Sequence, residues 1–278
     1  MRREQTLRVT LLPARVLWRL AVLLALGALA LVWLGRYTDL DLTLADAVFD
    51  ARSGAFPWRH AWLTETFNHV ILKWLLVLLA IGFIGLAVVD VVRPRPGLSA
   101  LARVQLRIVA LAAILVPAVT STLKQLSWSY CPWDLLRYGG DQPYVRLFGA
   151  FPANSFPGQC LPAGHASSAL WLLALAVFWL PAGPAAARRV ALLAIASGTA
   201  VAYLQQLRGA HFMTHTLWSI WIACVIVLVL IAALQAGAPQ RQELLVAIPA
   251  LCMAIFLPLS DVKNVLLAGV LVLPLLLG

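Results

Sequence analysis

Long apolar segments with almost no charge recur along this 278-residue chain, and they restrict its fold more than any other feature. A helix must be roughly 17–25 residues long to cross a bilayer core that is about 30 Å thick. Two shorter runs, 244–259 and 265–277, predict either two short helices or a broken pair. Six earlier runs meet or approach the spanning length: 16–34, 71–92, 108–123, 165–180, 190–205 and 212–234. We therefore expect an all-α, polytopic transmembrane bundle of six core helices plus a C-terminal helical pair, in one membrane domain over residues 1–278.

The composition agrees with a membrane protein and argues against a nucleic-acid partner. Apolar residues make up 62% of the chain and charged residues only 12%, whereas a soluble domain has roughly 25% charged residues. The mean hydropathy is +0.90. The net charge of +10 comes from basic residues that lie between apolar runs and form no groove-sized patch, so we expect no nucleic acid to bind.

The basic residues also predict the orientation of the chain. If each run spans once, they all fall on one side, which the positive-inside bias makes cytoplasmic. The first run follows a basic lead and is long enough to span, so residues 1–35 are interpreted as a retained helix and not as a signal peptide. The opposite, non-cytoplasmic side then receives segments 37–70, 124–164, 206–211 and 261–264. The residues that define the cytoplasmic side are Arg2, Arg3, Arg8, Arg15, Arg93, Arg95, Arg103, Arg107, Arg188, Arg189 and Arg241.

Three polar clusters, 124–140, 160–168 and 205–215, lie at the predicted outer ends of the apolar runs. Snorkelling explains a single Lys or Arg there, but ionisable groups converging at membrane depth indicate a functional site. Phosphoryl transfer fits these residue types, because it uses cations and N–H groups for the phosphate oxygens, a nucleophile, and an acid for the leaving alcohol. Gly164 and His165 begin a run, where free N–H groups favour an anion.

A metal site competes weakly with this interpretation. His211 and His215 are spaced i, i+4 and would present both imidazoles on one helical face, as a zinc site requires. No glutamate lies between them in an HExxH arrangement, and no carboxylate is close in sequence. We therefore expect neither a metal nor another cofactor.

The order and spacing of the residues in 124–218 resemble the type-2 phosphatidic acid phosphatases, relatives of the vanadium haloperoxidases. Lys124 stands seven residues before Cys131, within a Cys-Pro pair; residues 162–165 read Pro-Ala-Gly-His; and residues 211–215 read His-Phe-Met-Thr-His. The family pattern is Lys-x6-Arg-Pro, Pro-Ser-Gly-His and Ser-Arg-x5-His-x3-Asp. The CPWD, C-x-PAGH and RGAHF segments are most similar to a bacterial branch of the family.

The resemblance implies a role for each matching residue. His211 would attack phosphorus and become phosphohistidine, and His165 would protonate the departing oxygen. Lys124 would bind phosphate oxygens, together with the backbone at Gly164.

The sequence departs from the family pattern at four positions. Arg208 or Arg137 is a candidate for the missing guanidinium. Either His215 or an acidic residue from another segment would orient His211. We favour Asp134, ahead of Asp141, because a carboxylate stabilises imidazolium more strongly. The departures are Cys131 for arginine, Ala163 for serine, Gln205 for arginine and His215 for aspartate.

The four cysteines divide into two groups. Cys224 and Cys252 lie inside apolar runs and are most simply packing residues. Cys131 and Cys160 lie in the outer segment beside the first two motifs. They could form a disulfide or remain two free thiols, and we favour the disulfide because disulfides persist in an oxidising compartment.

We therefore predict a multi-pass phosphatase of the bacterial inner membrane whose site faces the periplasm. Its partner would be a lipid phosphate such as a polyprenyl diphosphate, a phosphatidyl phosphate or a lipid A phosphate. A lipid phosphotransferase is the enzymatic alternative, and a non-catalytic lipid-phosphate binder or transporter is the alternative from another class. The sequence does not give the oligomeric state.

Overall fold

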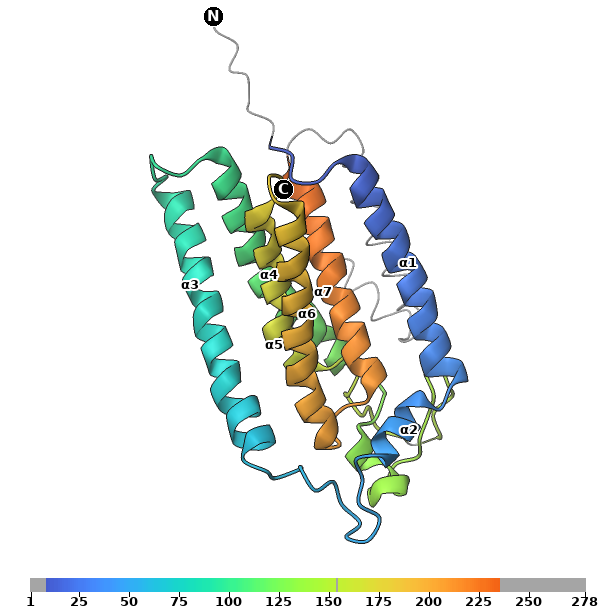
Figure 1. Cartoon of the computed structure of the whole chain (residues 1–278). Coiled ribbons are helices and arrows are strands. Elements are labelled where there is room, and N and C mark those ends of the chain that lie inside the picture. Colours follow the sequence, from blue (N-terminus) through green and yellow to red (C-terminus); the bar gives the residue numbers. More distant parts are fainter. Residues whose placement is uncertain (1–8, 154, 236–278) are drawn as a thin grey trace, which may run out of the picture.

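Six core helices run roughly along one axis in the computed structural model, which describes residues 9–153 and 155–235 (Figure 1). The six predicted core helices are confirmed, and runs 244–259 and 265–277 lie outside the described residues. Two of the core helices are composite, because η1 continues into α3 and α5 continues into η4. The long elements are α1 (Ala14–Tyr37), η1 (Leu63–Leu72), α3 (Lys73–Val92), α4 (Ala100–Gln125), α5 (Gly164–Leu170), η4 (Trp171–Trp179), α6 (Pro184–Leu207) and α7 (Met213–Leu234). The short ones are α2 (Leu40–Asp46), η2 (Pro132–Asp134) and η3 (Leu136–Tyr138).

Several helices extend beyond their apolar runs. The second core helix begins at Leu63 instead of residue 71, so part of the expected outer loop is helical. The third begins at Ala100, where the Ser99 hydroxyl accepts from the Ala102 N–H at 3.1 Å as an N-cap. The helix therefore includes Arg103 and Arg107, which were expected in a loop. Long basic side chains permit this because they carry their charge outward from a helical backbone.

The fourth core helix, Gly164–Trp179, is shorter than a spanning α-helix, but its second half is wound more tightly. Its first half is α-helical, and residues Trp171–Trp179 form a 3₁₀-helix. At about 1.5 Å per residue for the first part and about 2.0 Å for the second, the segment reaches close to the ~30 Å bilayer core. The change of helix type thus lets a short apolar segment cross.

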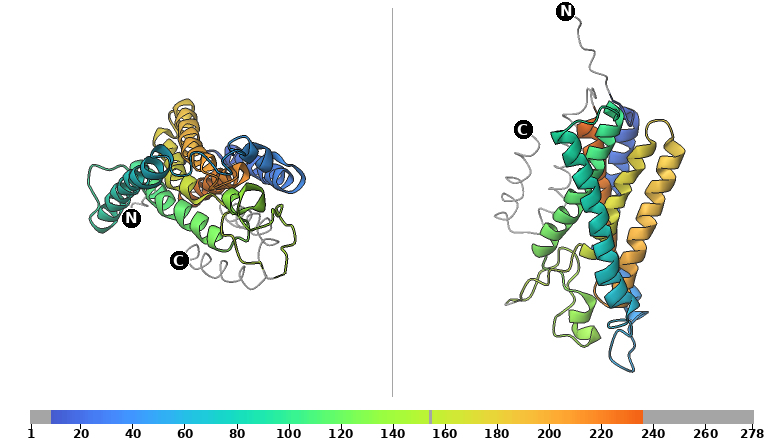
Figure 2. Two further views of the ribbon diagram at one scale, coloured as in Figure 1. Left: turned by 90° about the horizontal axis from the view of Figure 1, so that it is seen from below. Right: turned by 90° about the vertical axis from the view of Figure 1, so that its left-hand side faces the viewer.

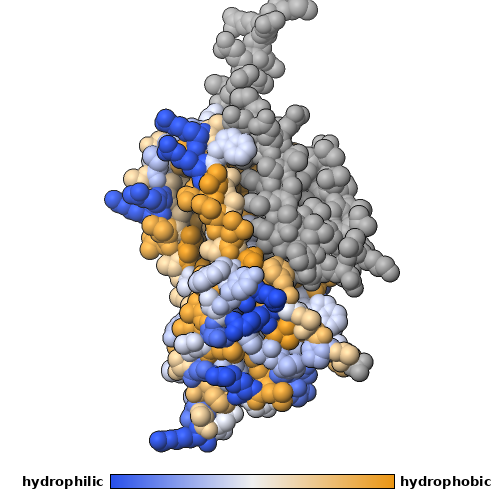
Figure 3. All heavy atoms as spheres, turned by 90° about the vertical axis from the view of Figure 1, so that its right-hand side faces the viewer, coloured by the Kyte–Doolittle hydropathy of each residue, from blue (hydrophilic) through white to orange (hydrophobic). Residues whose placement is uncertain are grey.

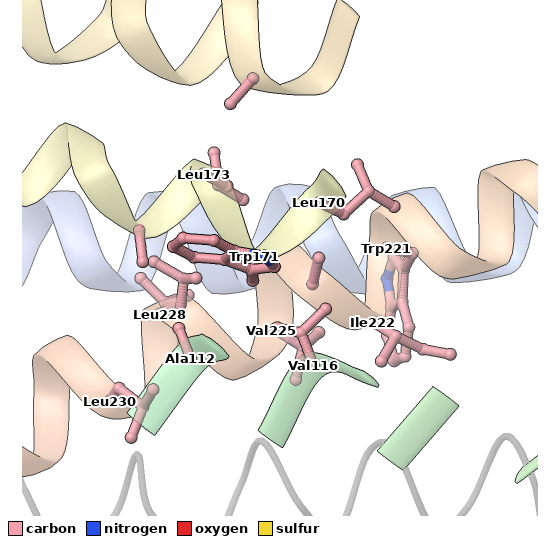
Figure 4. Packing of buried hydrophobic residues seen from close by; sticks show 14 of the residues in the cluster. Ala112, Val116, Leu170, Trp171, Leu173, Trp221, Ile222, Val225, Leu228 and Leu230 are labelled. Carbon is pink, nitrogen blue, oxygen red and sulfur yellow. The ribbon is translucent and has the colours of Figure 1, made fainter. Parts of the chain in front are cut away.

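The centre of the bundle is α7, which packs against α1, α4, α5 and α6. In its apolar window 61% of residues are buried, compared with 17% in those of α1 and of η1–α3, so the latter two lie at the periphery. Figure 4 shows the core between η4, α4 and α7, where Trp171 lies beside Ala112, Leu228 and Val225. Views along and across the bundle show α1 and α3 on opposite sides of this core (Figure 2).

The outward-facing side chains of the peripheral helices suit lipid. Leu23 and Leu29 of α1 are 62% and 65% exposed, and Leu193 of α6 is 70% exposed. On the face seen in Figure 3, apolar residues form the surface between polar residues at the upper end and over the lower half. Soluble proteins rarely expose contiguous apolar surface on this scale, so this surface is the one that faces the membrane lipid. The chain is therefore a multi-pass membrane protein, with five helices long and apolar enough to cross by themselves.

The two ends of the bundle differ in chemistry. The connections 93–99 and 180–183 lie at the upper end in Figure 1, together with the beginning of α1 and the end of α7. The lower end carries α2, η2, η3 and the long connection 126–163. The Asp41 carboxylate of α2 joins this end to α7, because it accepts from the Thr214 N–H at 2.9 Å and from the Thr214 hydroxyl. A carboxylate that accepts hydrogen bonds from the first turn of a helix stabilises that helix, because the N–H groups there have no partner within the helix. Asp41 of α2 does this for α7.

Candidate active site

Four helix ends meet at the lower end of the bundle, and each carries one of the residues singled out in the sequence. Lys124 is in the last turn of α4, and His165 is in the first turn of α5. Arg208 is the C-cap of α6, and His211 lies in the short connection to α7. The electrostatic interactions of His165 with Lys124, Arg208 and His211 place all four in one cluster.

The α6–α7 connection depends on a glycine. The N–H of Gly209 donates to Gln206 O at 2.9 Å and that of Ala210 to Gln205 O at 3.0 Å, which is the pair of bonds of a Schellman motif. Gly209 has a φ of 72°, and a Cβ there would lie 2.4 Å from a ring carbon of Phe56. The turn therefore needs glycine, and it delivers His211 to the start of α7.

Three hydrogen bonds hold the three motif segments together. The Ala163 N–H donates to His215 O at 3.1 Å, and the Ser219 hydroxyl donates to Ala163 O at 3.0 Å, so the segment before His165 is bound to α7. The Trp133 N–H donates to Gly209 O at 3.0 Å and so joins the first motif to the α6–α7 turn. Two of these bonds join main-chain atoms and the third uses the Ser219 hydroxyl, so none depends on a side chain that replaced a family residue.

Lys124 reaches toward the start of α5. A Cβ built on Gly164 would contact Cδ of Lys124 at 3.6 Å, so the lysine stem lies over this glycine. The ammonium group and the first N–H groups of α5 thus belong to the same part of the site. Such a combination of a cation and backbone donors is suited to the oxygens of an anion.

His211 is buried, at 3% exposure, against the disulfide between Cys131 and Cys160. Its Nδ1 lies 3.5 Å from Cys160 Sγ, and this sulfur also lies 3.3 Å from Ala210 O. A disulfide sulfur has no hydrogen, so it is a weak acceptor for an N–H at Nδ1. The arrangement favours the tautomer that leaves Nε2 with its lone pair.

The surroundings keep the His211 imidazole neutral. Burial lowers the pKa of His211 well below 6.5, and His215, Lys124 and His165 add to the shift, while the backbone of Cys160 opposes it. A neutral ring at physiological pH retains the nucleophilic lone pair that a protonated ring lacks.

Arg208 is held among polar groups at the edge of the cluster. Its guanidinium donates to Gln205 Oε1 at 3.1 Å, to Glu65 Oε1 at 3.2 Å and to the Arg59 carbonyl at 2.9 Å. Its side chain is only 8% exposed, and burial lowers its pKa while Glu65 opposes the shift. Gln205, which replaces a family arginine, therefore binds the guanidinium that lies one turn further along the chain.

Two predicted residues lie away from the histidines. The Asp134 carboxylate accepts from the Cys131 N–H at 3.1 Å within its own 3₁₀ turn, and within the described residues no hydrogen bond joins it to His211. Arg137 forms two bonds with Asp46, at 2.8 and 2.7 Å, and its side chain is 53% exposed. The structure thus gives Asp134 a local capping role through one carboxylate oxygen, and its role in orienting His211 stays a prediction. Arg137 is likewise satisfied by a surface partner.

His215 does not hydrogen-bond to His211 either. The two ring centroids are 5.8 Å apart with an interplanar angle of 68°. Nδ1 of His215 is buried and has no partner among the described residues. His215 instead borders a small cavity of about 30 Å³ that Asp41, Tyr144 and Thr214 also line, large enough for a water molecule. Burial raises the pKa of Tyr144 to about 12 and raises that of Asp41.

One arrangement of metal-ligand residue types occurs among the described residues. Ligand atoms of Cys131, Cys160 and His211 lie within 4.8 Å of one another. The two sulfurs are bonded to each other and so are not thiolates, the form that binds metal.

No role was predicted for His69 and Glu65, which the structure brings into the cluster from η1. The rings of His69 and His165 are 4.0 Å apart between centroids, and Glu65 pairs with Arg208. Neither residue belongs to a recognisable motif, and their helix begins before the apolar run. The hydropathy of the second run therefore gave no signal for them.

Residues 105–237 match the family model described as the PAP2 superfamily. The match includes Lys124, His165, Arg208 and His211, and excludes η1 with Glu65 and His69. No curated protein and no solved structure matches the chain.

Proposed function

Because residues 105–237 of this chain belong to the PAP2 superfamily, we propose that the protein is a membrane phosphatase that hydrolyses a lipid-linked phosphate or diphosphate. The observation that carries the proposal is the meeting of His211, His165, Lys124 and Arg208 at one end of an apolar bundle. Two cations beside a buried imidazole, His211, and a half-buried one, His165, suit a reaction in which a phosphate is bound, attacked and released from an alcohol.

In the first step Nε2 of His211 attacks phosphorus and the bond from phosphorus to the lipid oxygen breaks. His165 donates a proton to that oxygen, so the lipid leaves as an alcohol or, from a diphosphate, as a monophosphate. Lys124, Arg208 and the backbone N–H of Gly164 bind the other phosphate oxygens as charge develops on them. The position of Cys160 Sγ at Nδ1 supports attack by the opposite nitrogen.

In the second step water cleaves the phosphohistidine. His165, now neutral, accepts a proton from the water as the oxygen bonds to phosphorus. His211 regains its lone pair and inorganic phosphate departs. The same two imidazoles therefore serve both steps and return to their starting protonation states.

A lipid substrate is supported by the position of the cluster. It lies at the ends of helices whose middle portions are apolar and exposed. Trp62, Trp128 and Phe156 are 63%, 40% and 78% exposed near the same end, as side chains at a membrane interface are. The basic residues Arg93, Arg103 and Arg188 occupy the opposite ends of their helices, which supports a periplasmic site in an inner membrane.

Burial of His211 also supports a second candidate, a phosphotransferase. At 3% exposure a phosphohistidine would be shielded from bulk water, and a lipid hydroxyl arriving from the bilayer could accept the phosphate.

Purified protein in detergent, incubated with a panel of lipid phosphates and diphosphates, tests these proposals. Hydrolysis predicts release of inorganic phosphate without an acceptor. Phosphate that moves to an added acceptor lipid and not to water identifies a transferase. Binding of the lipids without either product would contradict both and identify a binder.

A further inference from the structure

The segment η1 is wound as a π-helix, and α6 fixes it at three positions. The fully buried Asn68 donates to Val201 O at 3.0 Å, and Gln205 donates to Thr64 O at 3.2 Å. Arg208 holds Glu65 at 3.2 Å. π-Helical turns often mark functional sites, because they give a side chain a position that an α-helix does not. The anchored element is therefore a rigid support for the residues it carries.

His69 is the next residue after Asn68, and it lies directly on the ring of His165. The centroids are 4.0 Å apart and the interplanar angle is 33°. Nε2 of His165 and Nδ1 of His69 are both buried without a hydrogen-bond partner among the described residues. In the part of the chain that the structure describes, no hydrogen bond at those two atoms fixes either ring, so the stack is the contact that orients the His165 imidazole.

We propose that His69 is a positioning residue, which holds the ring of His165 at the angle needed to deliver a proton to the leaving group. This inference rests on the proposed function for the role of His165, but the stack is a separate physical claim. A general acid works only when its N–H points along the bond being broken, and small displacements of catalytic groups are costly. His69 itself contacts no reacting atom in this account.

Substrates with poor and good leaving groups distinguish two roles for His69: positioning of the general acid His165, and general support of the structure. His69→Ala is expected to lower kcat for an alkyl phosphate roughly 10- to 100-fold, a part of the ~10²–10⁴-fold that a general acid contributes. Cleavage of p-nitrophenyl phosphate needs little acid assistance, so its kcat should change less than about 3-fold by the same reasoning. His69→Phe keeps an aromatic ring without nitrogens and is expected to restore most alkyl phosphate turnover.

His60→Ala is the matched control, because His60 lies just before η1, is 77% exposed and pairs with Glu65 Oε2 at 3.3 Å. Thermal unfolding in detergent verifies that each variant is folded. Equal losses on both substrates, failure of His69→Phe to restore turnover, or an equal effect of His60→Ala would overturn the proposal.

Nuclear magnetic resonance of histidine-labelled protein tests the stack without reference to activity, since the chain has only five histidines. His69→Ala should move the ring signals of His165, and His60→Ala should leave them in place. Unmoved His165 signals would overturn the positioning of His165 by His69. If the wild-type protein releases no phosphate from any substrate, the proposed function fails, and these signals still decide whether the stack exists.

Discussion

Arg208 and Arg137 are two guanidinium groups with very different surroundings, and only Arg208 lies beside the histidines. Arg208→Ala is expected to reduce phosphatase activity roughly 30- to 1000-fold, since one charge-assisted contact to a transition state is worth about 2–4 kcal/mol. Arg137→Ala should leave activity nearly normal, because its guanidinium pairs with Asp46 at the surface. Initial rates on one lipid phosphate provide the comparison. A normal Arg208→Ala with a defective Arg137→Ala would reverse the assignment.

The Cys131–Cys160 disulfide contacts the His211 ring and closes a loop with a sequence separation of 29 residues. Replacing both cysteines by serine is expected to lower stability by about 3–4 kcal/mol on the chain-entropy model. It should also lower turnover, because His211 loses the sulfur at Nδ1. Cys224→Ser is the control, since Cys224 is a free cysteine on α7. Thermal unfolding and turnover measure the two effects, and an unchanged double variant would show that the disulfide supports neither.

Individual residues also show where sequence reasoning ends. Motif order singled out Lys124, His165 and His211, and the structure brings them together, while their catalytic roles stay predictions. Asp134 was favoured as the partner of His211 because it lies close to the motifs in sequence, and a local turn occupies one oxygen of its carboxylate. Arg137 pairs with a residue 91 positions away, which spacing alone does not reveal.

At the scale of elements, α2 supports α7 through one carboxylate. Asp41→Ala removes the acceptor for the Thr214 N–H and is expected to destabilise the protein by about 1–2 kcal/mol, as loss of an N-cap does. Asp41→Asn keeps an oxygen acceptor, and burial already raises the pKa of this carboxyl, so the neutral amide should cost less. Thermal unfolding in detergent orders the three proteins. Equal stability of Asp41→Ala and wild type would rule out a capping role.

Helix type was the part of the fold that hydropathy did not reveal. The apolar runs located all six core helices, because lipid requires long apolar helices. They gave neither the π-helix of η1 nor the 3₁₀-helix of η4, since these depend on hydrogen bonds with neighbouring helices and on packing around Trp171. One of these two elements, η1, is the one that places Glu65 and His69 in the site.

For the whole molecule, we expect the site and the arginine-rich connections to lie on opposite sides of the membrane. Two single-cysteine probes mark the two ends of the bundle: Ser53→Cys at the end with the site and Gly97→Cys at the end with the arginine-rich connections. Both are made in a background in which Cys224 and Cys252 are replaced by serine. A Cβ at Gly97 meets nothing within 4 Å, so the substitution fits there. In intact cells whose outer membrane admits the reagent, a membrane-impermeant maleimide should label Ser53→Cys. It should label Gly97→Cys only after the inner membrane is permeabilised. The reverse pattern would place the site on the cytoplasmic side.

The central claim is that the bundle turns over a phosphate through His211, and trapping of the enzyme intermediate tests it most directly. Protein mixed with a ³²P-labelled lipid phosphate and quenched in alkali should carry label that is stable to alkali and released by acid, as phosphohistidine is. His211→Ala should carry no label. His215→Ala should still be labelled, because His215 forms no hydrogen bond with His211 in the structure. Labelled phosphohistidine that persists in folded His211→Ala would contradict the account.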